Sequence, residues 1–273
     1  MNENEVVKTL VSTKSVEKVY DDILSEPSKK AGNALGTIVN IGNTLLWPVK
    51  WVNERTRIYF ENNLRKYEDK LKNIPEEKII TVPTEISMPI LDRFTYVSNE
   101  EISNAFVQLL ANASSIDTIN KAHPSFIHII DRLSPDEALL LKYVYEEYFF
   151  VHLTIAYTNK DIRERLLNKK TNIRSKINLT LPQNDDIYID NILSLGLISD
   201  KDFYYSLTRG KNIQELVEKD FEEIISLNDS QFKKYYEENN VEENNIEKKE
   251  EIKGMYEITE YGRFFINACL CEK

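Results

Sequence analysis

Residues 98–113, SNEEISNAFVQLLANA, and residues 134–150, SPDEALLLKYVYEEYFF, decide the fold class. In each stretch a serine is followed three positions later by a glutamate, which is the sequence signature of a helix N-terminus. Phe106 and Leu110 then recur at the spacing of one helix face. Pro135 stands at the first helical position of the second stretch, where proline is well tolerated. Both stretches predict helices, and the fold class is expected to be mainly α.

The first half of the chain is expected to form a helical region over residues 1–132. Only 7 Gly and 8 Pro occur among 273 residues, and apolar side chains recur periodically over long windows. Two long helical stretches come before an extended linker near residues 75–90. The linker is predicted from its prolines, since residues that precede proline avoid the helical region.

The second half, residues 133–273, is typical of a winged-helix-like domain with a small β wing. Residues 186–195 predict a helix that Gly196 ends with a left-handed cap. Short strands are expected at residues 197–199, 203–207 and 255–258, and Thr259 is expected to cap a final helix.

An acidic insertion at residues 211–252 interrupts this domain. Its stretch from Gln214 to Glu251 holds 13 acidic and 5 basic residues, which accounts for most of the net charge of −10. The first part predicts an amphipathic helix through apolar residues such as Phe221 and Ile224. The second part, from about residue 235, is poor in apolar residues and is expected to be solvated. A solubilising role is the simplest interpretation, with binding of a basic partner or a regulatory cover as alternatives.

Residues 31–49 form a run of 19 uncharged residues, AGNALGTIVNIGNTLLWPV. A helix of that length reaches about 28 Å, close to the thickness of a hydrocarbon core. Asn and Thr nevertheless recur along one side, which is costly in lipid. We therefore favour a core or assembly helix, with membrane association as the alternative. The residues expected to mediate assembly or membrane contact are Leu35, Ile38, Val39, Leu45, Leu46 and Trp47.

A basic run precedes the helix predicted over residues 186–195, where a winged-helix protein would read DNA. That helix carries Asp186 and Asp190 and no basic residue, so its charge would repel phosphates. The basic run is either a solvated face or a weak, salt-sensitive nucleic-acid patch. The patch residues would be Arg163, Arg165, Lys169, Lys170, Arg174 and Lys176.

No recognisable catalytic or metal-binding motif accompanies these features. The sequence lacks a phosphate-binding glycine loop, a nucleophile elbow and a zinc-binding HExxH helix. His123 and His128 are five residues apart, and no further ligands complete a metal set. We predict no metal, no cofactor, no small-molecule substrate and no enzyme activity. Two Cys and the absence of a secretory signal predict a cytoplasmic protein.

Three stretches together resemble the abortive infection alpha family of bacterial phage-resistance proteins. They are PSKKAGNALG (27–36), ISMPILDRFTYVSNEEISNAFVQLLANA (86–113) and AHPSFIHIIDRLSPDEALLL (122–141). The C-terminal YEITEYGRFFINAC (256–269) is similar to the end of the family pattern. The resemblance implies a role in defence against phage through arrest or death of the infected cell. It brings no catalytic residue and no cofactor.

The leading hypothesis is an anti-phage abortive infection protein that acts through protein assembly or membrane engagement. Its partner would be another protein or a second copy of itself, with membrane association on activation as a further option. The alternative hypothesis is a winged-helix regulator or sensor that binds nucleic acid weakly.

Overall fold

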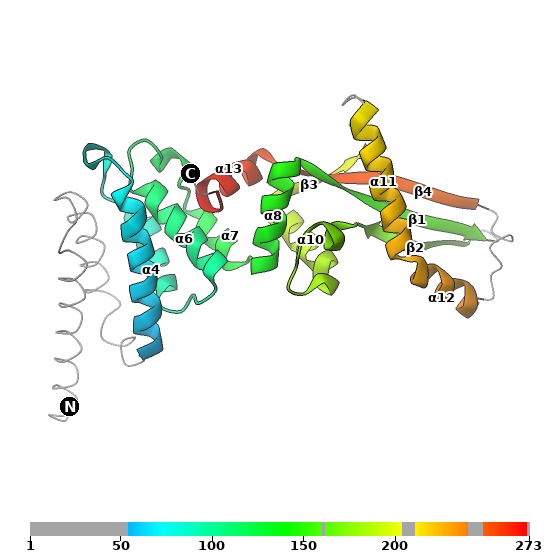
Figure 1. Ribbon diagram of the computed structural model, residues 1–273, viewed down its shortest axis with the longest axis horizontal. Coiled ribbons are helices and arrows are strands. Elements are labelled where there is room, and N and C mark those ends of the chain that lie inside the picture. Colours follow the sequence, from blue (N-terminus) through cyan, green and yellow to red (C-terminus); the bar gives the residue numbers. More distant parts are fainter. Residues whose placement is uncertain (1–53, 160–161, 204–210, 240–247, 272–273) are drawn as a thin grey trace. The chain divides into compact units, whose positions relative to one another are not determined.

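The structure is a computed structural model that describes residues 54–159, 162–203, 211–239 and 248–271 (Figure 1). Within these residues the protein is mainly helical, with one small antiparallel sheet. The chain divides into two compact units. The helical unit comprises the described residues of Met1–Ala138 and Phe264–Lys273, and the sheet unit is Leu139–Arg263. The predicted apolar segment, with Leu35, Ile38, Val39, Leu45, Leu46 and Trp47, lies outside the described residues.

The helical unit is built around one central helix, α6 (Glu100–Ala113), which packs mainly against four other helices of this unit. The residues on its inner face, including Phe106, Leu109 and Leu110, are fully buried. The helices of this unit are α4 (Glu54–Lys72), η1 (Glu76–Lys78), α5 (Thr84–Phe94), α6 (Glu100–Ala113), η2 (Ile119–Lys121), α7 (Ser125–Asp131), the start of α8 (Pro135–Glu147) and the end of α13 (Glu260–Cys269).

The predicted helix starts are close to the observed ones. At α8, the Ser134 backbone N–H donates to Glu137 Oε2 (2.5 Å), and the Glu137 N–H donates to Ser134 Oγ (3.3 Å), which confirms the predicted capping box. At α6 the cap is one residue later than predicted. Asn99, not Ser98, accepts the hydrogen bond from the Ile102 backbone N–H.

The extended linker predicted near residues 75–90 is wrong beyond Pro83. Helix α5 begins at Thr84, immediately after Pro83, and continues through Pro89 to Phe94. Before it, Ile79 forms an isolated bridge with Ser115, and the first turn of the segment is the short helix η1. A proline next to a helix start costs no hydrogen bond, since the first N–H groups have no partner within the helix. Pro83 therefore precedes a helix here instead of extending a linker.

The sheet unit contains four antiparallel strands in the order β2-β1-β4-β3, so β2 lies at one edge. The strands are β1 (Phe149–Asn159), β2 (Ile162–Lys170), β3 (Ile198–Asp202) and β4 (Lys248–Ile258), and the helices that belong wholly to this unit are α9 (Ile173–Lys176), η3 (Pro182–Asn184), α10 (Asp185–Ser194), α11 (Lys211–Leu227) and α12 (Asp229–Asn239). Figure 1 shows α11 crossing the strands, with α12 continuing from it near β2.

One face of the sheet is apolar and covered by these two helices. Side chains alternate along a strand, so every second residue of β1 lies on this face. Leu153 and Ile155 pack against Phe221 and Ile224 of α11 and against Phe232 of α12. We call this the apolar face: Val151, Leu153, Ile155, Tyr157, Leu167 and Met255 with the helix residues that cover them.

The acidic insertion at residues 211–252 therefore supplies the helices that cover this hydrophobic core. Its amphipathic first helix is confirmed as α11, whose Phe221 is buried. The second part, from residue 235, is solvated only in part. Glu237 and Glu238 are exposed as predicted, but Tyr235 and Tyr236 of α12 pack partly against the core, next to the buried Phe232. The end of the insertion, from Lys248, belongs to β4.

Other parts of the predicted C-terminal domain are found, but its winged-helix assignment is not confirmed. Gly196 has a φ of 70° after α10, as predicted for a left-handed cap. Thr259 caps α13, because its Oγ1 accepts the Gly262 backbone N–H at 2.9 Å. The long hairpin of β1 and β2 was not predicted, and the basic run lies on a strand, β2, for most of its length.

Candidate functional site

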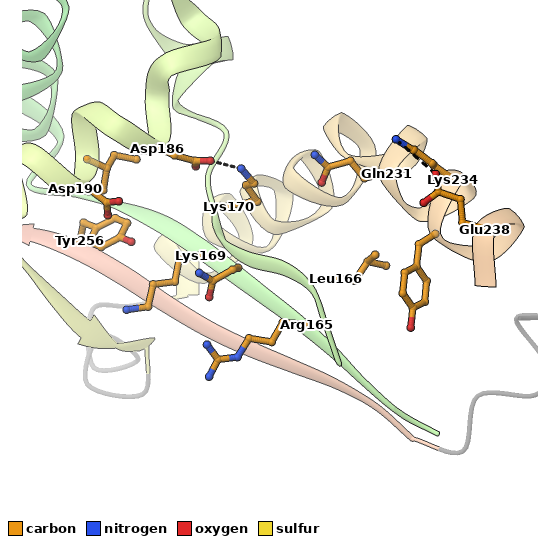
Figure 2. A pocket seen from close by; sticks show the side chains of 13 residues that line it. Arg165, Leu166, Lys169, Lys170, Asp186, Asp190, Gln231, Lys234, Glu238 and Tyr256 are labelled. Carbon is orange, nitrogen blue, oxygen red and sulfur yellow. Dashed lines mark hydrogen bonds and ion pairs between the residues drawn. The ribbon is translucent and has the colours of Figure 1, made fainter. Parts of the chain in front are cut away.

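A pocket of about 600 Å³ lies beside the edge strand β2, within the sheet unit (Figure 2). Its walls come from β2, from α10, from α12 and from one residue of β4. The lining residues are Arg165, Leu166, Asn168, Lys169, Lys170, Asp186, Ile189, Asp190, Gln231, Lys234, Tyr235, Glu238 and Tyr256. Ionisable side chains of both signs therefore gather at one cavity.

Three of the four cations at the pocket are held by carboxylates. Lys170 forms an ion pair with Asp186, and Figure 2 shows this link between β2 and α10. Lys234 is 3.7 Å from Glu238, one turn further along α12. Lys169 Nζ donates to Asp200 Oδ2 of β3 at 2.5 Å. The Lys170–Asp186 and Lys169–Asp200 pairs join different elements, whereas the Lys234–Glu238 pair lies within one helix and both of its side chains are largely exposed.

The backbone of β2 is irregular where it borders the pocket. The pairing of β1 with β2 shifts register between Leu153 and Ala156, and Lys169 has a φ of 49°. A left-handed conformation is uncommon for a side chain of this size. It is supported here because the Lys169 backbone N–H donates to Thr154 Oγ1 at 3.0 Å. Irregularities of this kind redirect side chains next to functional sites.

A buried histidine lies behind the Lys169–Asp200 ion pair. His152 Nε2 is 2.8 Å from Asp200 Oδ1, and only 4% of the residue is exposed. Burial lowers the pKa of His152 below its ordinary value, although the hydrogen bond and charge of Asp200 act in the opposite direction. Partial burial tends to raise the pKa of Asp200, but its hydrogen bonds from Lys169 and His152 outweigh this and the pKa is lowered. At neutral pH, a neutral imidazole thus lies next to a charged aspartate.

Gly254 makes room for this histidine. It lies opposite His152 on the neighbouring strand, and a Cβ added there would lie 2.3 Å from His152 Cε1. The imidazole in turn packs on the ring of Tyr256, with ring centroids 4.5 Å apart. A glycine at residue 254 therefore allows the histidine to support the tyrosine that lines the pocket.

Tyr256 presents a hydroxyl to the pocket. Only 2% of the residue is exposed, and its hydroxyl has no hydrogen-bond partner among the described residues. Burial, followed by the charges of Asp200, Asp190 and Asp186, raises the pKa of this phenol well above its ordinary value. The hydroxyl consequently keeps its proton at neutral pH and can donate a hydrogen bond.

The six residues of the predicted basic patch do not form one continuous basic surface. Arg165, Lys169 and Lys170 line the pocket, whereas Arg163, Arg174 and Lys176 do not. Four of the six are paired with acids, since Arg163 contacts Glu250 at 2.8 Å and Lys176 contacts Asp220 at 2.8 Å. Arg165 and Arg174 form no ion pair with any described residue.

Sequence reasoning did not find His152, Asp190, Asp200 or Tyr256 as site residues. The strand alternation of residues 149–157, FFVHLTIAY, could have indicated that His152 and Thr154 share one face. Nothing in the sequence indicates the pairing of His152 with Asp200, which are 48 residues apart.

No metal centre or membrane span is found in the part of the chain that the structure describes. Among these residues, no group of three or more His, Cys, Asp or Glu side chains is placed to hold a metal ion. Within the same ranges, no helix is both long and apolar enough to cross a bilayer.

Comparison with known proteins identifies the family. The family model described as abortive infection alpha matches residues 59–269, which is most of the chain and includes the whole sheet unit. The protein therefore belongs to the abortive infection alpha family, as the sequence resemblance predicted.

Other comparisons add little. No curated protein matches the chain. One similar solved structure is an uncharacterized protein from the hydrocarbon-degrading marine bacterium Alcanivorax borkumensis SK2. It is 18% identical, with a TM-score of 0.35 over 57% of this chain and 97% of that one.

Proposed function

We propose that this protein protects bacteria from phage by abortive infection and that it acts by binding and assembly, without catalysis. The observation that supports the defence role is the family match over residues 59–269. In this proposal the protein is cytoplasmic, and membrane association is an outcome of activation. The partner is another protein or a second copy of this chain.

The two parts of the chain have different tasks in this proposal. The uncharged segment at residues 31–49 exerts the effect on the cell through its apolar residues. The pocket beside β2 receives the molecule that controls this effect, because it gathers charged side chains of both signs in one cavity. Fixed, oriented polar groups around a cavity are the usual basis of specific recognition.

The direct test is phage challenge of cells that express the full chain. At a low ratio of phage to cells, plaque numbers should fall relative to an empty vector. At a high ratio the expressing culture should still stop growing or lyse without releasing phage, because abortive infection sacrifices the infected cell. Protection in which infected cells survive and divide would contradict an abortive mechanism.

A carboxylate introduced into residues 31–49 tests whether this apolar segment is needed for protection from phage. Leu45→Asp places a carboxylate on the expected apolar side, and Asn40→Asp places the same charge on the expected polar side. We expect Leu45→Asp to lose protection and Asn40→Asp to keep it, at equal soluble yields. Full protection by Leu45→Asp would contradict assembly or membrane engagement through this segment. Cell fractionation before and after infection then separates membrane engagement from assembly.

The ion pairs argue against the alternative function, a sensor that binds nucleic acid. Lysines that already neutralise Asp186 and Asp200 contribute little to the release of counterions from a nucleic-acid backbone. Arg165 and Arg174 are the two patch residues that would remain for phosphate contact. Any duplex DNA binding is expected to be weak and to disappear as salt is raised. Tight, sequence-dependent binding in a gel shift would favour the alternative.

A further inference from the structure

We propose that the pocket beside β2 binds a small phosphorylated molecule that also carries hydroxyl groups and has the size of a nucleoside monophosphate. The link of this ligand to defence rests on the function proposed above, whereas the binding itself stands on the geometry of the cavity. The sequence alone implied no small molecule.

Three ionisable side chains at the pocket have no hydrogen-bond or ion-pair partner among the described residues, and they differ in character. Arg165 is a cation, Asp190 is an anion, and the Tyr256 hydroxyl is a buried neutral donor. In Figure 2, Asp190 and Tyr256 come from α10 and β4, and Arg165 comes from β2. A simple inorganic anion would satisfy Arg165 but would leave Asp190 facing a negative charge. A ligand with an anionic group and separate hydroxyl groups can satisfy all three.

Arg165 is suited to the anionic group of this ligand. A guanidinium donates two parallel hydrogen bonds to a phosphate or carboxylate, and these bonds are stronger than those between neutral groups. The Tyr256 hydroxyl can add one donated bond at the other side of the pocket. Asp190 can accept hydrogen bonds from sugar hydroxyls, which is how acidic residues commonly hold ribose.

The remaining cations limit how much negative charge the pocket accepts. Lys169, Lys170 and Lys234 are already paired with carboxylates. A second or third phosphate would have to displace Asp186, Asp200 or Glu238 from these lysines, or lie next to them. One phosphate, placed near Arg165, therefore suits the site better than a polyphosphate or a nucleic-acid strand.

The size and apolar surfaces of the pocket fit a mononucleotide. A volume of about 600 Å³ falls within the usual range for small-molecule sites, about 300–1,000 Å³. Leu166, Ile189 and the ring of Tyr235 provide apolar lining for a base or a sugar. The amides of Asn168 and Gln231 can each donate and accept hydrogen bonds at the edge of a base.

The test is isothermal titration calorimetry of the full chain with a defined set of probes. The set contains the four ribonucleoside 5′-monophosphates, ribose 5-phosphate, the matching nucleosides and triphosphates, and inorganic phosphate. We expect at least one monophosphate to bind saturably. Its nucleoside should bind at least about tenfold more weakly, because it loses the charge-assisted contact with Arg165. Inorganic phosphate lacks the hydroxyl groups and the base, and the additional phosphates of the triphosphate compete with the carboxylates that hold the lysines, so each of these should also bind at least about tenfold more weakly.

Matched variants locate the binding. Arg165→Gln should weaken the monophosphate about tenfold, and Tyr256→Phe, which removes a hydroxyl that has no protein partner, about fivefold. Arg163 lies on the same strand but does not line the pocket, so Arg163→Gln should leave the affinity for the monophosphate unchanged. Thermal unfolding of each variant checks that the fold is retained.

Several outcomes would overturn the inference. It fails if none of the monophosphates or ribose 5-phosphate binds at millimolar concentration, or if inorganic phosphate binds as tightly as they do. It also fails if Arg165→Gln and Tyr256→Phe bind the monophosphate as tightly as the native chain. Intact binding in a chain that gives no phage protection would count against the proposed function and not against this site.

Discussion

The two faces of the four-stranded sheet are made from the same strands but have opposite chemistry. On the apolar face, Leu153 and Ile155 are covered by α11 and α12. On the other face, which we call the polar face, His152, Asp200 and Tyr256 form contacts that lead to the pocket. Alternate residues of β1 therefore stabilise the fold on one face and, in the function proposed above, contribute to recognition on the other. Changes to each face should therefore have separable effects.

The largest expected effect is loss of stability from the apolar face. Phe221 of α11 is buried and meets the ring of Phe203 edge to face, with centroids 5.4 Å apart. Phe221→Ala should lower the free energy of unfolding by about 3–5 kcal/mol, because it removes buried surface and leaves a cavity. Urea unfolding followed by circular dichroism measures this loss.

The control for this variant is a leucine on the same helix. Leu216 is 62% exposed, so Leu216→Ala should change the free energy of unfolding by no more than about 0.5 kcal/mol. If the two variants were equally destabilised, α11 would not cover the apolar face as described.

A smaller loss of stability is expected from a substitution on the polar face, at Gly254. Gly254→Ala should cost about 1–3 kcal/mol, because the new methyl group overlaps the His152 imidazole. In a His152→Ala background the imidazole is absent, so the same substitution should cost at least about 1 kcal/mol less. A double-mutant cycle in urea measures this coupling. Additive costs would show that the histidine does not occupy the space above Gly254.

A smaller effect is expected in the pH dependence of stability. The pKa of His152 is below 6.5 in the folded chain, so the unfolded chain binds this proton more readily. The free energy of unfolding should therefore fall as the pH drops below 6.5, by at most about 1.4 kcal/mol per pH unit from this group. The loss should stop once the pH passes below the folded pKa. Urea titrations between pH 7 and pH 5 measure the slope.

Two variants separate the contribution of His152 from those of other groups. His152→Phe should flatten the slope in this window. Leu216→Ala, a change of an exposed residue without charge, is the control and should leave the slope as it is. Asp200 affects the pH dependence of stability only at lower pH. Its pKa is below the ordinary 3.8, so its contribution is present at neutral pH and is lost only as the pH falls through its folded pKa. An unchanged slope in His152→Phe would contradict the burial of this imidazole.

Helices α6 and α8 of the helical unit, and α10, β3 and β4 of the sheet unit, could be predicted because their signals are local, whereas α5 was missed. The Ser134–Glu137 capping box, Gly196 and Thr259 each specify a helix end within four residues of sequence. The order of α10, β3, β4 and α13 followed from such signals. The family resemblance was also carried by short continuous stretches.

The pocket could not be predicted because its contacts join distant residues. Lys169 and Asp200 are 31 residues apart, and His152 and Asp200 are 48 apart, with no repeated spacing between them. The basic run was visible, but the acids that neutralise it were not assigned to it. The amphipathic pattern of α11 was visible in the sequence, but Tyr235 and Tyr236 of α12 stand next to acidic residues, so the second part of the insertion was interpreted as solvated.

The most direct test of this account is phage protection by two arginine variants of the same strand. Cells that express Arg165→Gln and cells that express Arg163→Gln are challenged in parallel with the native chain, at matched protein levels. If the polar face serves recognition, Arg163→Gln should protect as the native chain does, and Arg165→Gln should lose protection without losing stability. Full protection by Arg165→Gln would contradict a role for the pocket in defence.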